Sequence, residues 1–284
     1  MLAYRHAFHA GNHADVLKHL VLAQVLRHMA AKDKPYTLID THAGAGGYSL
    51  EGRYAHTKDE FEGGIAKLYA RDDLPAALAD YVALVREFNG GGSLEQYPGS
   101  PAIANLLLRA DDRLRLFELH PTDERILRAF LGKRPHTEIT LGDGFAALAK
   151  QLPPVSRRGV VLIDPSYEMK SDYNKVLAAV RETLERFASA VILVWLPQLR
   201  TIEATQLPQR LQNTAAKAAP KGWLHARLTV AAPDVRGYGL LGSSMFVINP
   251  PHGLHDTLCE VLPFLVEELG QFDGASFLLE QQAA

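Results

Sequence analysis

Short apolar runs alternate with amphipathic segments along most of the chain. The runs have the length of buried strands, and the segments between most of them carry apolar residues at helical spacing. Strands are expected at 36–40, 114–119, 137–141, 159–163, 190–196 and 245–248, and a further run at 224–231 alternates more and is expected at a sheet edge. Helices are expected near 14–31, 101–109, 122–131, 144–151, 173–187, 203–217 and 255–269. This alternation predicts an α/β doubly wound fold, with a parallel sheet covered by helices on both faces.

The alternation breaks between residues 47 and 98. This interval holds no convincing strand, but it holds two helical patterns, near 63–71 and 75–88, followed by Asn89-Gly-Gly-Gly92. A β-α-β step needs about 30 residues, and the chain from Asp40 to Glu118 is far longer. We therefore predict a helical insertion over residues 50–98, within a main domain formed by residues 1–49 and 99–284.

Charge is nearly balanced over the whole chain but not at its start. The 284 residues carry a net charge of −2, which excludes a globally basic nucleic-acid binder but leaves room for a local basic face. The first 35 residues contain five Lys or Arg against two Asp, and five of the twelve histidines. No His-Glu-x-x-His motif and no nearby cysteine accompany these histidines, so we expect no metal site there. We expect a segment that lies near an anion or a nucleic acid.

Other features bear on the class of protein. No apolar run approaches the ~18–20 residues that span a bilayer, and the polar N-terminal segment has no apolar core of a secretory signal. The single cysteine, Cys259, has no internal partner for a disulfide. We therefore expect a soluble cytoplasmic protein with no membrane contact.

Acidic residues recur where the predicted strands end. Asp40, Glu118, Asp143 and Asp164 each follow a strand, and ligands of open parallel sheets bind at these carboxyl ends. Each carboxylate alone is equally compatible with a helix N-cap, but four of them favour a shared ligand that carries hydroxyls and amines.

The loop after the first strand narrows the choice of ligand. Gly44-Ala-Gly-Gly47 is no dinucleotide fingerprint, because the third glycine is replaced by Ser49, and no Gly-Lys-Ser/Thr follows as in a phosphate-binding loop. A glycine loop with a distant strand-end acid suits a nucleoside without a pyrophosphate. S-adenosylmethionine fits this description, with Glu118 accepting hydrogen bonds from the ribose hydroxyls.

Asp164-Pro-Ser-Tyr167 resembles the (Asp/Asn)-Pro-Pro-(Tyr/Phe) motif of methyltransferases that act on exocyclic amino groups. The lone pair of such a nitrogen is delocalised into the ring, so acceptors for its protons help it become nucleophilic. Asp164 and the carbonyl of Pro165 provide acceptors, proline holds that carbonyl rigidly, and Tyr167 is expected to stack on the base. The alternative is an ordinary strand-to-turn Asp-Pro.

A second copy of this pattern, Asn249-Pro-Pro-His252, also follows a strand. It has both prolines but lacks a good stacking ring. Because its strand is the last of the predicted sheet, we expect a structural loop rather than the catalytic one.

Motifs along nearly the whole chain resemble the RlmJ family, whose members are S-adenosylmethionine-dependent methyltransferases of an adenine N6 in 23S ribosomal RNA. The longest is the opening segment, Tyr4 to His19. The others are Asp40-Thr-His-Ala-Gly-Ala-Gly46, Tyr97-Pro-Gly-Ser-Pro101, Glu118-Leu-His-Pro121, Pro153-Pro-Val-Ser-Arg-Arg-Gly159, Asp164-Pro-Ser-Tyr-Glu-Met-Lys170 and Ile248-Asn-Pro-Pro251.

The resemblance implies a class I methyltransferase (Rossmann-like) fold with a small helical insertion. It also implies Asp164 as the catalytic proton acceptor and Tyr4 as a contact to the RNA. The implied cofactor contacts are His19, His42, Ser100, Glu118, Gly142, Asp143 and Asp164. The sequence departs from the family at Ser166, where the motif usually has a second proline, so the loop loses one fixed φ.

The expected partner is naked or partly assembled 23S ribosomal RNA, bound by a monomer without a metal. Two alternatives stay open from the sequence. One is an N6-adenine methyltransferase that acts on DNA, and the other is a non-catalytic nucleic-acid-binding module on the same fold.

Overall fold

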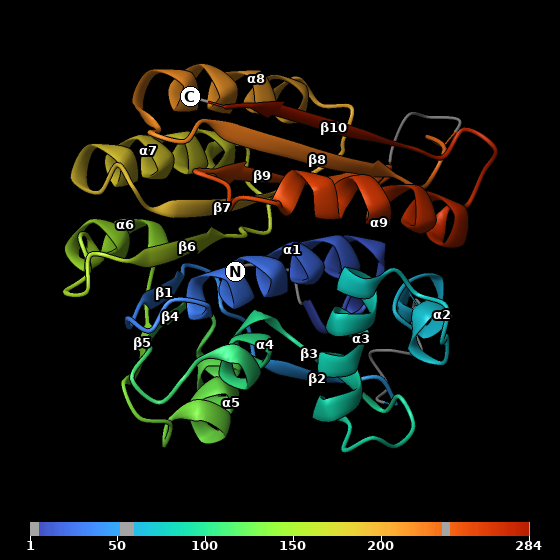
Figure 1. Cartoon of the computed structure of the whole chain (residues 1–284), viewed down its shortest axis with the longest axis horizontal. Coiled ribbons are helices and arrows are strands. Elements are labelled where there is room, and N and C mark those ends of the chain that lie inside the picture. Colours follow the sequence, from blue (N-terminus) through green and yellow to red (C-terminus); the bar gives the residue numbers. More distant parts are fainter. Residues whose placement is uncertain (1–5, 52–59, 235–238, 284) are drawn as a thin grey trace.

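An eight-stranded sheet forms the centre of the protein (Figure 1). The computed structural model describes residues 6–51, 60–234 and 239–283. The strands lie in the order β10-β8-β9-β7-β6-β1-β4-β5. Their bounds are β1 Thr37–Asp40, β4 Arg113–Glu118, β5 Thr137–Leu141, β6 Gly159–Ile163, β7 Val191–Pro197, β8 Trp223–Thr229, β9 Gly242–Ile248 and β10 Ser276–Gln282. Strands β5, β4, β1, β6 and β7 run parallel, whereas β9 is antiparallel to both β7 and β8.

Helices cover both faces of the sheet, so the predicted doubly wound architecture is confirmed. One apolar core lies between the sheet and α1 (His13–Ala30), α3 (Ala76–Phe88), α4 (Ser100–Leu107), α5 (Pro121–Leu131) and α9 (Leu254–Leu269). A second core packs α6 (Gly144–Leu148), α7 (Ser171–Arg186) and α8 (Ile202–Ala218) on the other face. Short 3-10 turns at His6–Phe8 (η1) and Ala149–Gln151 (η4) precede α1 and follow α6.

Helix α1 is buried along most of its length, which explains its apolar sequence. It starts where the side chain of Asn12 accepts hydrogen bonds from the backbone amides of Ala14 and Asp15. It then crosses β9 and packs against α3, α4 and α9. A helix enclosed in this way presents several faces to the core, so any charged side chain on it must find a partner inside the protein.

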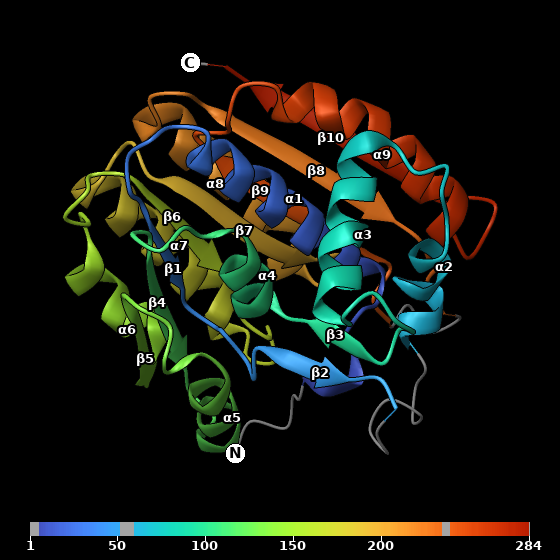
Figure 2. The ribbon, with the colours of Figure 1, turned by 60° about the horizontal axis from the view of Figure 1, so that its bottom comes forward.

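The interval between β1 and β4 contains helices, as predicted, but also strands that were not predicted. Helix α3 and the short α2 (Ala66–Tyr69) follow a 3-10 turn, η3 (Glu60–Gly63). A two-stranded antiparallel ribbon of β2 (Gly47–Ser49) and β3 (Gln96–Pro98) lies at the base of these helices (Figure 2). The expectation of no strand in this interval is therefore wrong, because strands of three residues are too short to leave a periodic pattern. Side chains of α3 belong to the same core as α1.

The prediction that 224–231 forms an edge strand is wrong as well. Strand β10 pairs antiparallel with β8 along all of its length, from Trp223↔Gln282 to Thr229↔Ser276. The sequence of β10, Ser-Phe-Leu-Leu-Glu-Gln-Gln, neither alternates nor forms an apolar run, so it was not recognised as a strand. The alternation in β8 reflects its polar positions within the sheet and not an open edge.

Within the described residues, no helix is long and apolar enough to cross a membrane.

Candidate active site

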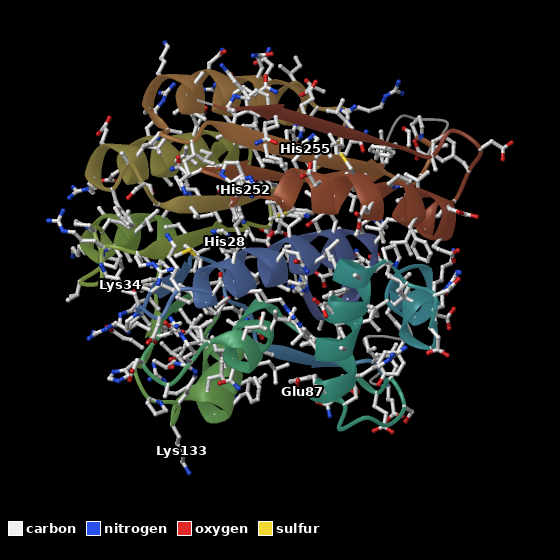
Figure 3. The ribbon with its side chains drawn as sticks, viewed as in Figure 1. His28, Lys34, Glu87, Lys133, His252 and His255 are labelled. Atoms are coloured by element: carbon white, nitrogen blue, oxygen red, sulfur yellow. The ribbon has the colours of Figure 1, made fainter. Side chains whose placement is uncertain are left out.

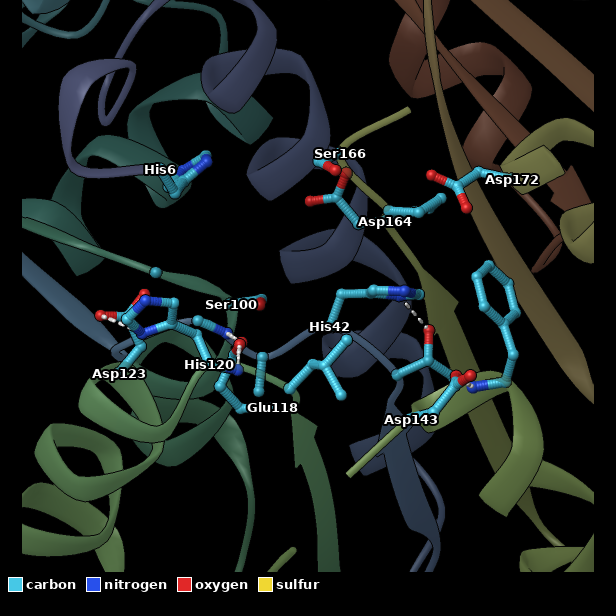
Figure 4. A pocket seen from close by; sticks show the side chains of 18 of the residues that line it. His6, His42, Ser100, Glu118, His120, Asp123, Asp143, Asp164, Ser166 and Asp172 are labelled. Carbon is cyan, nitrogen blue, oxygen red and sulfur yellow. Dashed lines mark hydrogen bonds and ion pairs between the residues drawn. The ribbon is translucent and has the colours of Figure 1, made fainter. Parts of the chain in front are cut away.

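A cavity of about 570 Å³ opens at the carboxyl ends of β1, β4, β5 and β6. Its volume is in the range of small-molecule sites. Glu118, His120 and Asp123 stand on one side of it, and Asp164, Ser166 and Asp172 stand on the opposite side (Figure 4). Of the predicted site residues, the cavity is lined by His19, His42, Ser100, Glu118, Gly142, Asp143 and Asp164. The topology thus brings together all the predicted cofactor contacts from four strand ends and two helices.

Asp164, directly after β6, is bound by a lysine from the first helix. The ammonium of Lys18 donates to Asp164 Oδ2 at 2.7 Å and also lies 2.7 Å from Asp15 Oδ1. Burial alone lowers the pKa of Lys18, but the two carboxylates outweigh it and raise that pKa well above its usual value. A charged ammonium therefore faces Asp164 at neutral pH.

Asp15 connects this pair to the segment that precedes α1. Its carboxylate accepts from Nε2 of His6 and from the backbone amide of Gly11, both at 2.9 Å. Burial alone raises the pKa of Asp15, but His6, Lys18 and His19 together hold it well below its usual range. The histidine-rich start of the chain is thus hydrogen-bonded to the candidate site, and His6 itself lines the cavity.

Lys18 was not singled out from the sequence, and His6 was considered only with His9, His13 and His19 as a metal ligand, an interpretation that the sequence disfavoured. Lys18 and Asp15 are spaced i, i+3, as in any exposed helical ion pair, and such pairs are usually solvated. Lys18 and Asp15 lie among the apolar positions Val16, Leu17 and Leu20. This pattern could have indicated that the pair is buried.

Glu118 closes the glycine loop from the end of β4. Its Oε2 accepts from the backbone amide of Gly44 and its Oε1 from that of His120, each at 2.7 Å. Burial raises the pKa of this carboxyl. Gly44 has φ +63°, and a Cβ there would collide with the hydroxyl of Tyr48, so the tight turn that faces Glu118 needs glycine.

Asp143 caps a helix and lines the cavity at the same time. Its Oδ1 accepts from the amides of Phe145, at 2.9 Å, and Ala146, at 3.4 Å, at the start of α6. The N-cap alternative therefore holds for this residue, and it does not remove Asp143 from the cavity wall.

Asp40 does not line the cavity, but it accepts hydrogen bonds from two residues that do. Its carboxylate accepts from the hydroxyl of Ser100 at 2.6 Å and from the backbone amide of His42 at 3.1 Å. Burial is the main cause that raises its pKa to about 6. Asp40 thus positions two cavity residues, one from α4 and one from the glycine loop. Burial also lowers the pKa of His42 to about 4, so this ring is neutral at pH 7.

Tyr167 is not in the cavity. Its ring is buried beside Tyr173 and Trp195, at centroid distances of 4.7 and 5.9 Å, and its hydroxyl donates to the carbonyl of Trp195 at 2.7 Å. Its φ of 54° turns the chain here, while Ser166 lines the cavity. In this conformation the ring packs under the loop, and stacking on a base would require the loop to rearrange. Tyr4, the other predicted substrate contact, lies outside the described residues.

The second proline motif lies at the opposite end of the strands from the cavity. Because β9 runs antiparallel to β7, its carboxyl end is far from the cavity. The amide of Asn249 donates to the carbonyls of Ala188 and Ala190 at 2.8 and 2.7 Å, and its Oδ1 accepts from the amide of Lys221 at 2.9 Å. The loop ends near the last turn of α1, where His252 and His28 lie close together (Figure 3). Asn249 therefore joins three loops and takes no part in the cavity.

Metal-binding geometry is not found in the described part of the chain, where no three His, Cys, Asp or Glu side chains are grouped to hold an ion.

Comparison with known proteins places the chain in a family. A family model described as "Ribosomal RNA large subunit methyltransferase D, RlmJ" matches residues 33–278. The chain belongs to the RlmJ family. Ribosomal RNA large subunit methyltransferase J of Escherichia coli (strain K12) is 45% identical over 269 residues, which cover 95% of this chain and 94% of that protein. The protein of the same name from Haemophilus influenzae (strain ATCC 51907 / DSM 11121 / KW20 / Rd) is 40% identical over 281 residues, or 99% and 98% of the two chains.

A solved structure has the same fold as this chain. The crystal structure of protein LPL1258 from Legionella pneumophila str. Philadelphia 1 superposes with a TM-score of 0.87 at 30% sequence identity, and the match covers 96% of this chain and 98% of that one. Because the match covers nearly the whole chain, it includes the segment between β1 and β4 with its ribbon and helices.

Proposed function

We propose that this protein transfers a methyl group from S-adenosylmethionine to the exocyclic N6 of an adenine in 23S ribosomal RNA. The observation that carries the proposal is the buried contact between Lys18 and Asp164 at the wall of a nucleoside-sized cavity. Membership of a family of ribosomal RNA methyltransferases supports the substrate class.

The cavity residues fit S-adenosylmethionine. Glu118 offers carboxylate lone pairs for ribose hydroxyls, although each of its oxygens already accepts one backbone amide. His19 lines the cavity, and its Nε2 is buried and has no partner in the described part of the protein. His19, His42, Ser100, Gly142 and Asp143 would complete the set that holds the cofactor. When bound, S-adenosylmethionine supplies an electrophilic methyl group on a sulfonium sulfur.

Asp164 performs the acid–base part of the reaction. An ionised carboxylate accepts a hydrogen bond from the N6 amino group and draws its lone pair out of conjugation with the ring. Pro165 fixes the backbone carbonyl beside it. Once the nitrogen carries the methyl group it is acidic, and Asp164 accepts its proton. The ammonium of Lys18 holds the carboxylate in place before the base arrives.

The RNA must present the target base outside its stack. We propose that Tyr4 and the cationic, histidine-rich N-terminal segment contact the RNA, which is naked or partly assembled 23S RNA. The enzyme would act as a monomer in the cytoplasm, where ribosomes are assembled. Holding base and cofactor together in one cavity is expected to provide most of the rate enhancement.

Mass spectrometry of ribosomal RNA tests the proposal. A strain that lacks this protein is expected to lose one N6-methyladenosine from its 23S RNA. The wild-type gene restores it and an Asp164→Asn variant does not, because the amide keeps an acceptor oxygen but loses the negative charge. Retention of every N6-methyladenosine in the deletion strain, or full restoration by Asp164→Asn, contradicts the proposal.

The alternatives predict different results with purified protein. A DNA methyltransferase would modify an adenine-containing DNA oligonucleotide faster than a 23S RNA fragment. A non-catalytic module would bind RNA and fail to bind S-adenosylmethionine in calorimetry.

A further inference from the structure

Three buried side chains form a chain of hydrogen bonds that ends at the cofactor cavity. The hydroxyl of Tyr81 on α3 lies 2.7 Å from that of Tyr97 on β3, and the hydroxyl of Tyr97 lies 2.7 Å from Nδ1 of His19 on α1. All three side chains are almost fully inaccessible to solvent. His19 lines the cavity, and its other ring nitrogen, Nε2, is buried without a partner among the described residues.

Counting protons determines the direction of these hydrogen bonds. Each tyrosine has one O–H, and a neutral imidazole has one N–H. If Nδ1 of His19 donated to Tyr97, three protons would share two contacts. The proton of one tyrosine would then have no acceptor among the hydrogen bonds of the described residues.

The reverse direction satisfies both tyrosines. Tyr81 donates to Tyr97, Tyr97 donates to Nδ1 of His19, and the imidazole proton resides on Nε2. The one donor without an acceptor then belongs to His19, the member of the three that lines the cavity, where a ligand can accept its hydrogen bond. The ring is neutral, as the count requires, because burial and the ammonium of Lys18 lower the pKa of His19 well below its usual value.

We propose that Tyr97, supported by Tyr81, is a positioning residue that fixes His19 in the tautomer with its proton on Nε2, so that His19 donates a hydrogen bond into the cofactor cavity. The matching ligand group is an acceptor, and in S-adenosylmethionine the strongest acceptor is the methionine carboxylate. This last step rests on the proposed function, whereas the tautomer itself does not.

The hydrogen bonds from Tyr81 through Tyr97 to His19 connect the segment between β1 and β4 to the site. Tyr81 comes from α3 and Tyr97 from β3, and neither lines the cavity. The chain between β1 and β4 therefore orients a cofactor residue of α1 through two hydroxyl groups.

Nitrogen-15 NMR of the histidine rings tests the tautomer directly. A protonated and an unprotonated ring nitrogen have well-separated chemical shifts, and the His19 signals are assigned by their absence in His19→Asn. In the wild-type protein without cofactor, the proton is expected on Nε2 of His19. Finding it on Nδ1 overturns the proposal, whether or not the protein methylates RNA.

Two matched variants test the consequence for binding. Tyr97→Phe removes the contact to Nδ1, and it is expected to mix the tautomers and weaken S-adenosylmethionine binding in calorimetry by roughly three- to tenfold. Tyr81→Phe removes a hydroxyl from the same pair, but Tyr97 can still donate to Nδ1. It should keep the Nε2 tautomer and bind nearly as the wild type does. Equal losses of affinity in both variants, or an unchanged tautomer in Tyr97→Phe, overturn the role of Tyr97.

Discussion

The ammonium of Lys18 and the carboxylate of Asp164 lie 2.7 Å apart, although 146 positions separate them in the chain. Lys18 is buried in α1, and Asp164 ends β6 at the cavity. Removing one member of a buried ion pair leaves the other charge without compensation. The position of the proposed proton acceptor therefore depends on a residue of the first helix.

Replacing Lys18 with methionine is expected to lower methyl transfer at pH 7 by at least roughly tenfold. Without the ammonium, the Asp164 carboxylate loses its buried hydrogen-bond donor and is no longer held in place at the cavity wall. Single-turnover reactions with a 23S fragment measure the rate. Lys18→Arg keeps a cationic donor and should retain more of the rate than Lys18→Met. A Lys18→Met rate equal to that of the wild type would exclude this role of Lys18.

Glu118→Gln is expected to weaken binding of S-adenosylmethionine by ~1–3 kcal/mol, which is the scale of a charged hydrogen bond. The amide cannot accept at both atoms, so either the amide of Gly44 or that of His120 also loses an acceptor. Titration calorimetry provides the dissociation constant. Glu138→Gln, which changes an exposed carboxylate paired with Arg115 on neighbouring strands, is the matched control and should bind normally. An unchanged constant for Glu118→Gln would exclude its role in the cofactor site.

Asn249→Ala is expected to reduce stability and to spare catalysis. The substitution leaves the buried carbonyl of Ala190, the partly buried carbonyl of Ala188 and one backbone amide without their partner. We expect a loss of roughly 2–4 kcal/mol in the free energy of unfolding in urea. Turnover per folded molecule should stay near that of the wild type. If turnover disappears while stability is retained, the assignment of Asp164 and not Asn249 to the catalytic loop is wrong.

His225 is expected to make the protein less stable in acid. Its ring is buried on β8, and desolvation, with a smaller contribution from Arg227, lowers its pKa to about 4. Glu280 is the facing carboxylate, at 3.9 Å from Nδ1. The folded-state pKa is below the unfolded value of about 6.5. The contribution of His225 to the free energy of unfolding is therefore fully present above the unfolded-state pKa of about 6.5. It is lost as the pH falls from about 6.5 towards 4.

Replacing this ring with phenylalanine isolates the effect. Between pH 7.5 and pH 5, the free energy of unfolding of the wild type should fall by about 2 kcal/mol more than that of His225→Phe. Urea titrations at the two pH values measure the difference. Equal losses in both proteins would show that His225 titrates normally in the folded state.

The sequence by itself determined the layers of this protein and the family to which it belongs. The apolar runs of β6 and β7 are long enough to reveal buried strands, since a strand covered on both faces is mostly apolar. The shorter apolar stretches of β1 and β4 fit the same rhythm. The resulting strand ends then located Glu118 and Asp164 without coordinates, and the motifs pointed to the family. Strands of three residues, and the polar β10, lack such a pattern and were missed.

Only the tertiary structure decided which side chains meet. Nothing local distinguishes Lys18 from a solvated helical lysine, and nothing near Tyr81 links it to His19. These contacts join positions far apart in the chain, and they exist because α1 is enclosed by other elements. The antiparallel direction of β9 likewise removed Asn249 from the cavity. Periodicity reports whether a residue is buried, whereas the partner of a buried polar group is set by the packing of the whole chain.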